Sequence, residues 1–149
     1  MNSETTKKPI FKKWWNFALS TFVIVGCAAT LTPAQQSYMS KVNAASTTFR
    51  IPKNQSDNAW QRAQVFVSKY SSLTIQSTTN NVLETKSPVG KLYAFGYNVN
   101  RLDIGDSTEF SVSCSTGNNF ATGKANDNAH ICADYIASGQ LPYPELINK

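Results

Sequence analysis

Residues 92–99 show the most regular alternation of side chains in this chain. Aromatic or β-branched residues occupy every second position, and Leu92, Ala94, Gly96 and Asn98 lie between them. A period of two sends successive side chains to opposite faces of a strand, and strict alternation over seven or more residues indicates a strand with one buried face. The face expected to be buried carries Tyr93, Phe95, Tyr97 and Val99. The alternative is that these aromatic side chains form an exposed platform that stacks on bases or sugars.

Shorter strands are predicted on both sides of this segment. Asn80 and Asn81 tolerate a positive φ and predict a tight hairpin, and Gly105 lies in a second predicted turn. Strands joined consecutively by tight turns predict an antiparallel meander. The expected strands cover residues 47–52, 72–78, 82–86 and 108–115, in addition to 92–99.

Two segments have the apolar spacing of amphipathic helices. Residues 57–71 follow Ser56, a good N-cap residue. A second helix is expected from Asn126 or Asp127 to about Ser138, with Gly139 ending it. The predicted fold class is therefore α+β: an antiparallel meander of about four to five strands with two helices packed on one face, in the order β-α-β-β-β-β-α.

The chain begins with a lysine-rich segment that is followed by a short apolar run. The run covers residues 17–26 and ends at Cys27. It is too short to cross a bilayer, which takes about 20 helical residues, and a cationic start before such a run is typical of an export signal. Two alternatives are a short uncleaved membrane anchor and ordinary secretory cleavage after Ala44, which follows Val42-Asn43.

Ile24-Val25-Gly26-Cys27 resembles the lipobox of bacterial membrane lipoproteins at all four positions. The resemblance implies that residues 1–26 are a signal peptide, that Cys27 is lipidated, and that the mature chain is anchored in the cell envelope. Because Ala28 and not Asp follows the cysteine, it further implies the outer membrane, facing the periplasm, in a Gram-negative cell. In a Gram-positive cell the anchor would lie in the outer face of the plasma membrane.

Residues 27–46 are expected to form the lipidated cysteine and a flexible tether, because they are rich in Ala, Thr, Gln and Ser without a sustained period. Such a tether would span about 25 Å. Residues 47–149 would then form a single α+β domain, large enough for one hydrophobic core.

The chain has three cysteines, and two remain if Cys27 carries lipid. Disulfides persist in the oxidising compartment that an exported chain enters. Cys114 lies on the apolar face of its expected strand, and Cys132 lies on the apolar face of its expected helix. We therefore predict a Cys114–Cys132 disulfide, which would close a loop of about 18 residues and stabilise the fold by about 3 kcal/mol. The alternative, a metal or redox site, lacks the closely spaced cysteine or histidine pairs that zinc sites use.

Residues that could carry catalysis are few. His130 lies near Cys132 and Asp134, but steps of two along a helix point in diverging directions. A second group of carboxylates, at Asp103, Asp106 and Glu109, surrounds a turn, where such side chains commonly bond to the backbone. We therefore predict no catalytic residue, metal site or cofactor.

Charge also limits the function. From Cys27 onward the chain has about ten basic residues and about eight acidic ones. The basic residues are scattered singly along the sequence, so a nucleic-acid partner is not predicted.

The sequence favours a small lipid-anchored envelope protein that acts as a binding, assembly or accessory module for another envelope component. One alternative is a small-ligand-binding protein or hydrolase that uses residues 117–128 and the aromatic strand. Another is an inhibitor or immunity protein of a periplasmic enzyme, with Gly117-Asn118-Asn119-Phe120 as the inserting loop. An enzyme should gather at least two titratable groups in a pocket, whereas a binding module should show an apolar groove or an unpaired sheet edge.

Overall fold

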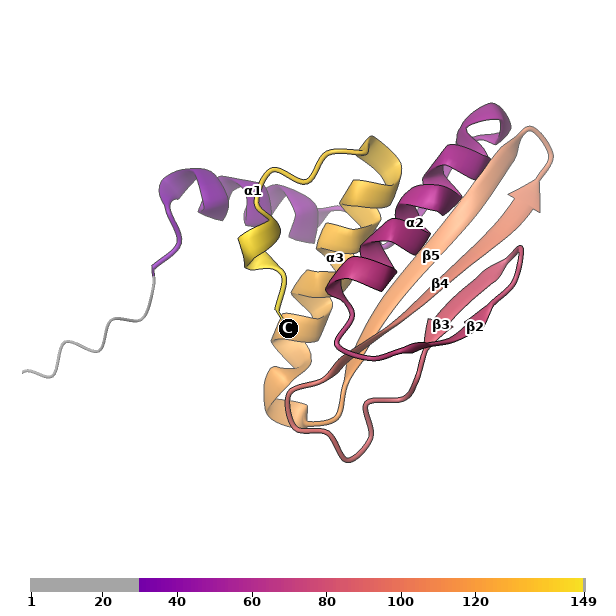
Figure 1. Cartoon of the computed structure of the whole chain (residues 1–149). Helices are drawn as coiled ribbons and strands as arrows, with labels where there is room; N and C mark the ends of the chain where they lie inside the picture. The colour runs from indigo at the N-terminus through magenta and orange to yellow at the C-terminus, as the bar shows by residue number, and fades with distance from the viewer. Residues whose placement is uncertain (1–29, 149) are drawn as a thin grey trace, which may run out of the picture. The chain divides into compact units, whose positions relative to one another are not determined.

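A five-stranded antiparallel sheet with helices packed on one face makes up the part of the chain that the computed structural model describes, residues 30–148 (Figure 1). The α+β class predicted from the sequence is confirmed, and a further helix precedes the predicted elements. The helices are α1 (Pro33–Ala44), α2 (Ser56–Tyr70) and α3 (Thr122–Ser138), and the strands are β1 (Thr48–Pro52), β2 (Ile75–Thr78), β3 (Val82–Thr85), β4 (Phe95–Ile104) and β5 (Ser107–Thr116). Three short 3-10 turns complete the fold: η1 (Lys53–Gln55), η2 (Asn119–Ala121) and η3 (Pro144–Leu146).

The strands lie in the order β1-β5-β4-β3-β2, so the first strand pairs with the last. Strands β2 to β5 form the predicted meander, while α2 carries the chain across the sheet face from β1 to β2 (Figure 1). The pairing of β1 with β5 runs from Thr48–Ser111 to Pro52–Ser107. Since β1 has 5 residues and β5 has 10, the far half of β5 extends beyond its partner.

The core lies between the sheet and the two helices α2 and α3. The Phe66 ring on α2 meets the Tyr97 ring of β4 edge-on at 5.7 Å between centroids, and Trp60 packs against Phe110 of β5. The strand prediction is correct for Phe95, Tyr97 and Val99, which are buried. It is wrong for Tyr93, which lies before β4 and is exposed.

Residues 33–44 are helical, which corrects the predicted tether over residues 27–46. Thr32 and Gln35 form a reciprocal capping box at the start of α1, and Pro33 occupies its first turn. The helix buries Val42. The hydroxyl of Tyr38 donates to Asp134 on α3 at 3.3 Å. The compact unit that contains the sheet accordingly includes α1 and starts at Leu31, not at residue 47. Cys27 and the lipobox lie outside the described residues.

The ends of the other two helices also differ from the prediction. Ser56 lies inside α2 and its predicted N-cap role is wrong, because η1 leads the chain directly into the helix. Helix α3 begins at Thr122, about four residues before the predicted start, because η2 precedes it. Gly139 ends α3 as predicted, with a left-handed φ of +74°. Among residues 30–148, no helix combines the length and apolar character needed to span a bilayer.

Candidate functional site

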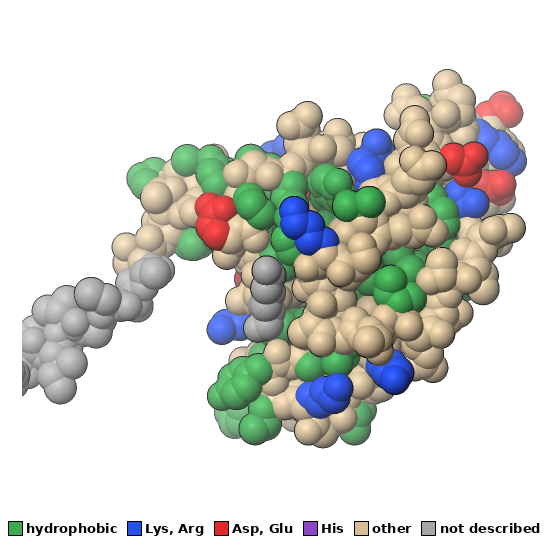
Figure 2. Space-filling model, viewed as in Figure 1, with side chains coloured by type: hydrophobic (Ala, Val, Ile, Leu, Met, Phe, Trp, Pro, Cys, Tyr) green, Lys and Arg blue, Asp and Glu red, His purple; other side chains and the backbone are tan. Residues whose placement is uncertain are grey.

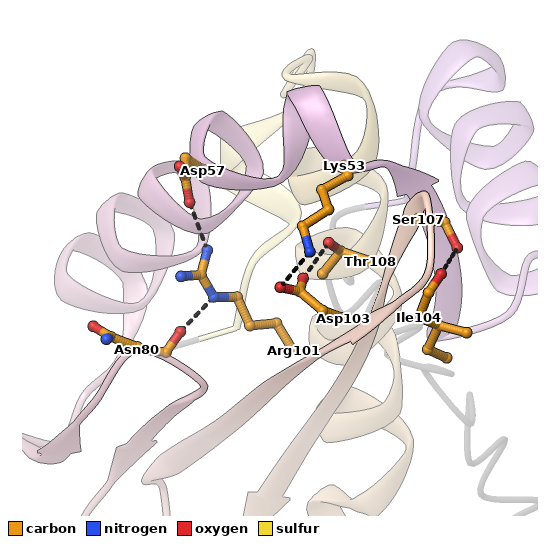
Figure 3. Close-up of polar contacts among 8 residues, drawn as sticks. All are labelled: Lys53, Asp57, Asn80, Arg101, Asp103, Ile104, Ser107 and Thr108. Carbon is orange, nitrogen blue, oxygen red and sulfur yellow. Dashed lines mark hydrogen bonds and ion pairs between the residues drawn. The ribbon is translucent and has the colours of Figure 1, made fainter.

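Two carboxylates around the β4–β5 turn, those of Asp103 and Glu109, are paired with cations, and Figure 3 shows the Asp103 pair. Asp103 lies 3.1 Å from the Lys53 ammonium and accepts a hydrogen bond from the Thr108 hydroxyl at 2.7 Å. Glu109 pairs with Arg50 at 2.9 Å. The backbone carbonyl of Asp106 accepts from the Lys53 amide. These three acidic residues, which the sequence groups around one turn, thus serve local structure.

Arg101 links this end of the sheet to α2 and to the β2–β3 hairpin. Its guanidinium bonds to Asp57 at 3.0 Å and to the Asn80 carbonyl (Figure 3). It also lies over the Trp60 ring, 5.0 Å from the centroid, which is a cation–π geometry.

The Thr108 hydroxyl is the largest cause of a lowered pKa at Asp103, followed by the Lys53 ammonium. A lowered folded-state pKa means that the interaction stabilises the fold above the ordinary carboxyl pKa and is lost as the pH falls through the folded value. We expect Thr108→Val to move the Asp103 pKa upward, toward its ordinary range. A carbon-13 NMR titration of the carboxyl would measure this, and an unchanged titration would show that the hydroxyl is not responsible.

The two described cysteines face one another across the sheet–helix interface. Cys114 lies opposite Tyr97 in the β4–β5 ladder and points toward the helices, and Cys132 on α3 is fully buried. Their sulfurs are not bonded in the structure, so the disulfide stays a prediction. Burial raises the pKa of Cys114 to about 12 and that of Cys132 well above its ordinary value, with the nearby Cys114 adding to the rise. Both groups are therefore neutral thiols, whereas catalysis and metal binding use the thiolate.

His130, Cys132 and Asp134, which lie close together in the sequence, have different environments in the structure. Cys132 faces the core, whereas the Asp134 carboxylate bonds to the Tyr38 hydroxyl. His130 is half-buried, and its Nδ1 atom has no hydrogen-bond partner among the described residues. Within residues 30–148, no three histidine, cysteine or acidic side chains gather in a way that could hold a metal ion.

A groove of about 400 Å³ runs along the open end of β5, beside α3; we refer to it as the β5 groove. Its walls carry hydroxyl and amide side chains and some small apolar ones, and Cys114 is the one ionisable side chain among the described residues that line it. The lining residues are Thr47, Val112–Thr116, Asn118, Asn119, Thr122, Ala125, Asn126 and Ala129.

The backbone of β5 lacks a partner along this groove. The Val112 amide donates to the Thr47 carbonyl at 3.0 Å, so the polar backbone groups of Val112 point toward β1. Backbone groups alternate in direction along a strand, so those of Cys114 and Thr116 point the same way. No described residue pairs with them there, because the chain before Thr47 turns away into α1. The β5 groove thus lies beside an unpaired stretch of sheet edge, which can in principle accept a further strand.

A second surface lies where the loop before β4 meets the loop before α3. Four large apolar side chains project there: Val89 (83% exposed), Leu92 (65%), Tyr93 (79%) and Phe120 (100%). We call these four residues the apolar tip. Hydrophobic side chains gather at this end of the molecule in Figure 2, beside basic side chains. The cavity at the tip, of about 610 Å³, is lined by Leu92, Tyr93, Phe120 and Lys124 among others.

Gly117 and Asn118 hold the two tip loops together. A Cβ atom on Gly117 would overlap the backbone carbonyls of Pro88 and Lys91, so only glycine fits at this approach. The Asn118 side chain donates to the Leu92 carbonyl at 2.5 Å. It also accepts from the Phe120 and Ala121 amides at 2.7 and 3.0 Å. The two loops are therefore joined by the Asn118 side chain and by the close approach that Gly117 allows, while the apolar side chains of the tip stay in solvent.

The chain matches no protein-family model, and the curated proteins and solved structures likewise yield no match. Its function therefore has to be inferred from the chemistry of the β5 groove and the apolar tip.

Proposed function

We propose that this protein is a lipid-anchored module of the cell envelope whose domain binds an extended segment of another envelope protein along the β5 groove. The open edge of β5 carries the proposal. An extended peptide can satisfy the free backbone groups of Cys114 and Thr116 by adding a strand to the sheet, a common mode of peptide recognition. The groove beside this edge is uncharged, which favours a segment of small polar residues over a charged one.

The anchor part of the proposal depends on the lipobox residues. Because α1 begins at Pro33, the six chain steps from Cys27 to the helix span at most about 20 Å. The predicted tether of 19 residues would have allowed a much longer reach. An acylated Cys27 would therefore hold the domain close to the bilayer surface.

We expect Cys27→Ser to leave an unprocessed precursor in cells, because the lipid acceptor is lost. The intact mass of the wild-type protein from the membrane fraction should correspond to a chain that begins at Cys27 and carries acyl groups. A mature start after Ala44, or an unmodified thiol at Cys27, would contradict the anchor.

The β5 groove can be tested by photocrosslinking in cells. A benzophenone amino acid at Thr122, which lines the groove, should give a covalent adduct with one envelope protein. A synthetic peptide of the crosslinked segment should then bind the purified protein.

Asn126→Trp fills the groove and should weaken binding of that peptide at least tenfold. Gln61→Trp places the same side chain on an exposed position of α2 as a control and should leave binding unchanged. Equal affinities for the two variants, in proteins with equal thermal stability, would refute binding at the β5 groove.

A further inference from the structure

The apolar tip differs from the other exposed apolar side chains of the domain because Leu92, Tyr93 and Phe120 line one cavity and Val89 lies on the same loop as Leu92 and Tyr93. Leu31, Val65, Ile75 and Leu102 are also exposed, but they lie singly on separate elements. Isolated apolar side chains on a surface are ordinary, whereas a cluster marks an interaction site. The tip presents two aliphatic and two aromatic side chains from two loops that Gly117 and Asn118 lock together.

The charge around the tip has one sign. Residues 86–96 and 117–126 contain Lys86, Lys91 and Lys124 and no aspartate or glutamate. The acidic side chains Asp57, Asp103 and Glu109 lie instead around the β4–β5 turn and the start of α2, where they pair with cations. Asp127, just beyond the second segment, accepts a bond from Asn43 of α1.

We propose that the apolar tip inserts into the headgroup region of an anionic phospholipid bilayer. Aromatic and aliphatic side chains at such an interface bury their apolar parts, and lysines beside them meet lipid phosphates. A protein that bound this surface would need acidic groups around an apolar pocket. An anionic bilayer offers negatively charged phosphates above an apolar layer over its whole surface.

The position of the anchor supports a lipid partner. This inference rests on the acylated Cys27 of the proposed function, but it is independent of the β5 groove. An anchor within about 20 Å of α1 keeps the domain at the bilayer, so even weak insertion by the tip acts at a high effective concentration. Insertion would fix the orientation of the domain and with it the direction in which the β5 groove opens.

The test uses the mature lipidated protein in vesicles free of other proteins, with Phe120→Trp as the probe. Trp14 and Trp15 leave with the signal peptide, and Trp60 is buried. In vesicles of equal parts phosphatidylglycerol and phosphatidylcholine, the emission of the introduced tryptophan should shift to the blue. Spin-labelled lipids should quench this emission, and acrylamide should quench it several-fold less than the emission of a tryptophan exposed to water. Leu102→Trp, an exposed site on β4, is the matched control, and its introduced tryptophan should remain accessible to acrylamide.

The blue shift of the Phe120→Trp protein should be larger in vesicles that contain phosphatidylglycerol than in pure phosphatidylcholine. Replacing Lys86, Lys91 and Lys124 by Gln should remove this difference. Lys69→Gln on α2 should not. Equal acrylamide quenching of the Phe120→Trp and Leu102→Trp proteins in vesicles would overturn the inference. Shielding of the tip tryptophan only after envelope proteins are added would also overturn it and would assign the tip to a protein. Because the intact mass of each sample reports acylation separately, a lipidated protein with an exposed tip would refute this inference alone.

Discussion

Gly117→Ala is expected to destabilise the domain by about 3 kcal/mol, which is at the upper end of the usual cost of overpacking. The added methyl group meets the backbone carbonyls of Pro88 and Lys91. Neither carbonyl can rotate away as a side chain could, so one of the two tip loops has to move. The Asn118 bond to the Leu92 carbonyl would be lengthened or lost with that movement. Equilibrium unfolding in urea would measure the change, with far-UV circular dichroism as the signal.

Gly123→Ala is the matched control for this substitution. Gly123 lies in the first turn of α3, and a Cβ atom there would have no neighbour within 4 Å. Alanine favours a helix over glycine by up to about 1 kcal/mol, so this variant should be as stable as the wild type or slightly more stable. Equal effects of the two substitutions would show that the tip loops are not held together at Gly117.

The parts of the fold that follow a strong periodic pattern could be predicted from the sequence. The alternation around Phe95 and Tyr97 predicts a buried strand because a pleated strand exposes every second side chain. The helical spacing around Phe66 and Val67 works in the same way for α2. These residues are buried on the faces that the patterns indicate.

Helix α1 could not be predicted in this way because little of it is buried. Val42 is its one buried residue, and only Tyr38 and Met39 beside it pack partly buried against the core, so the apolar stripe is short. Besides this packing, α1 has the Thr32–Gln35 capping box and polar contacts with distant residues, such as the Asn43 bond to Asp127 at 2.9 Å. The Thr-Pro-Ala-Gln sequence at its start contains the capping signal, but the small polar residues around it favour a tether when composition alone is considered.

The two candidate surfaces depend on information that a sequence does not carry directly. The β5 groove exists because β1 is shorter than β5 and pairs with its first half, and this neighbour relation joins residues far apart in the chain. The apolar tip needs Leu92 and Phe120 to come together through Gly117. The sequence indicates that Phe120 belongs to an exposed loop. It predicts Tyr93 to be in the core because the alternation of side chains already starts before the first residue of β4.

Oxidised protein is expected to be more stable than reduced protein by about 3 kcal/mol, because a Cys114–Cys132 bond closes a loop of about 18 residues in the unfolded chain. Forming the bond removes two protons and two electrons from the two thiols, and a disulfide of an envelope oxidant accepts them and becomes a dithiol. The reaction needs a thiolate, and burial raises the pKa of both groups. The bond should therefore form during folding, before α3 packs on β5.

Urea unfolding with and without reductant would measure this effect, and intact mass would count the two hydrogens lost. In the oxidised background Cys114→Ala and Cys132→Ala should each cost about 3 kcal/mol or more, because either one removes the bond. Cys132→Ala should cost somewhat more, since Cys132 is fully buried and its removal leaves a cavity. The double variant should be little worse than Cys132→Ala alone, because the two residues act as one unit. Equal unfolding midpoints with and without reductant, or additive losses in the double variant, would show that the two thiols stay apart and merely fill the core beside Tyr97.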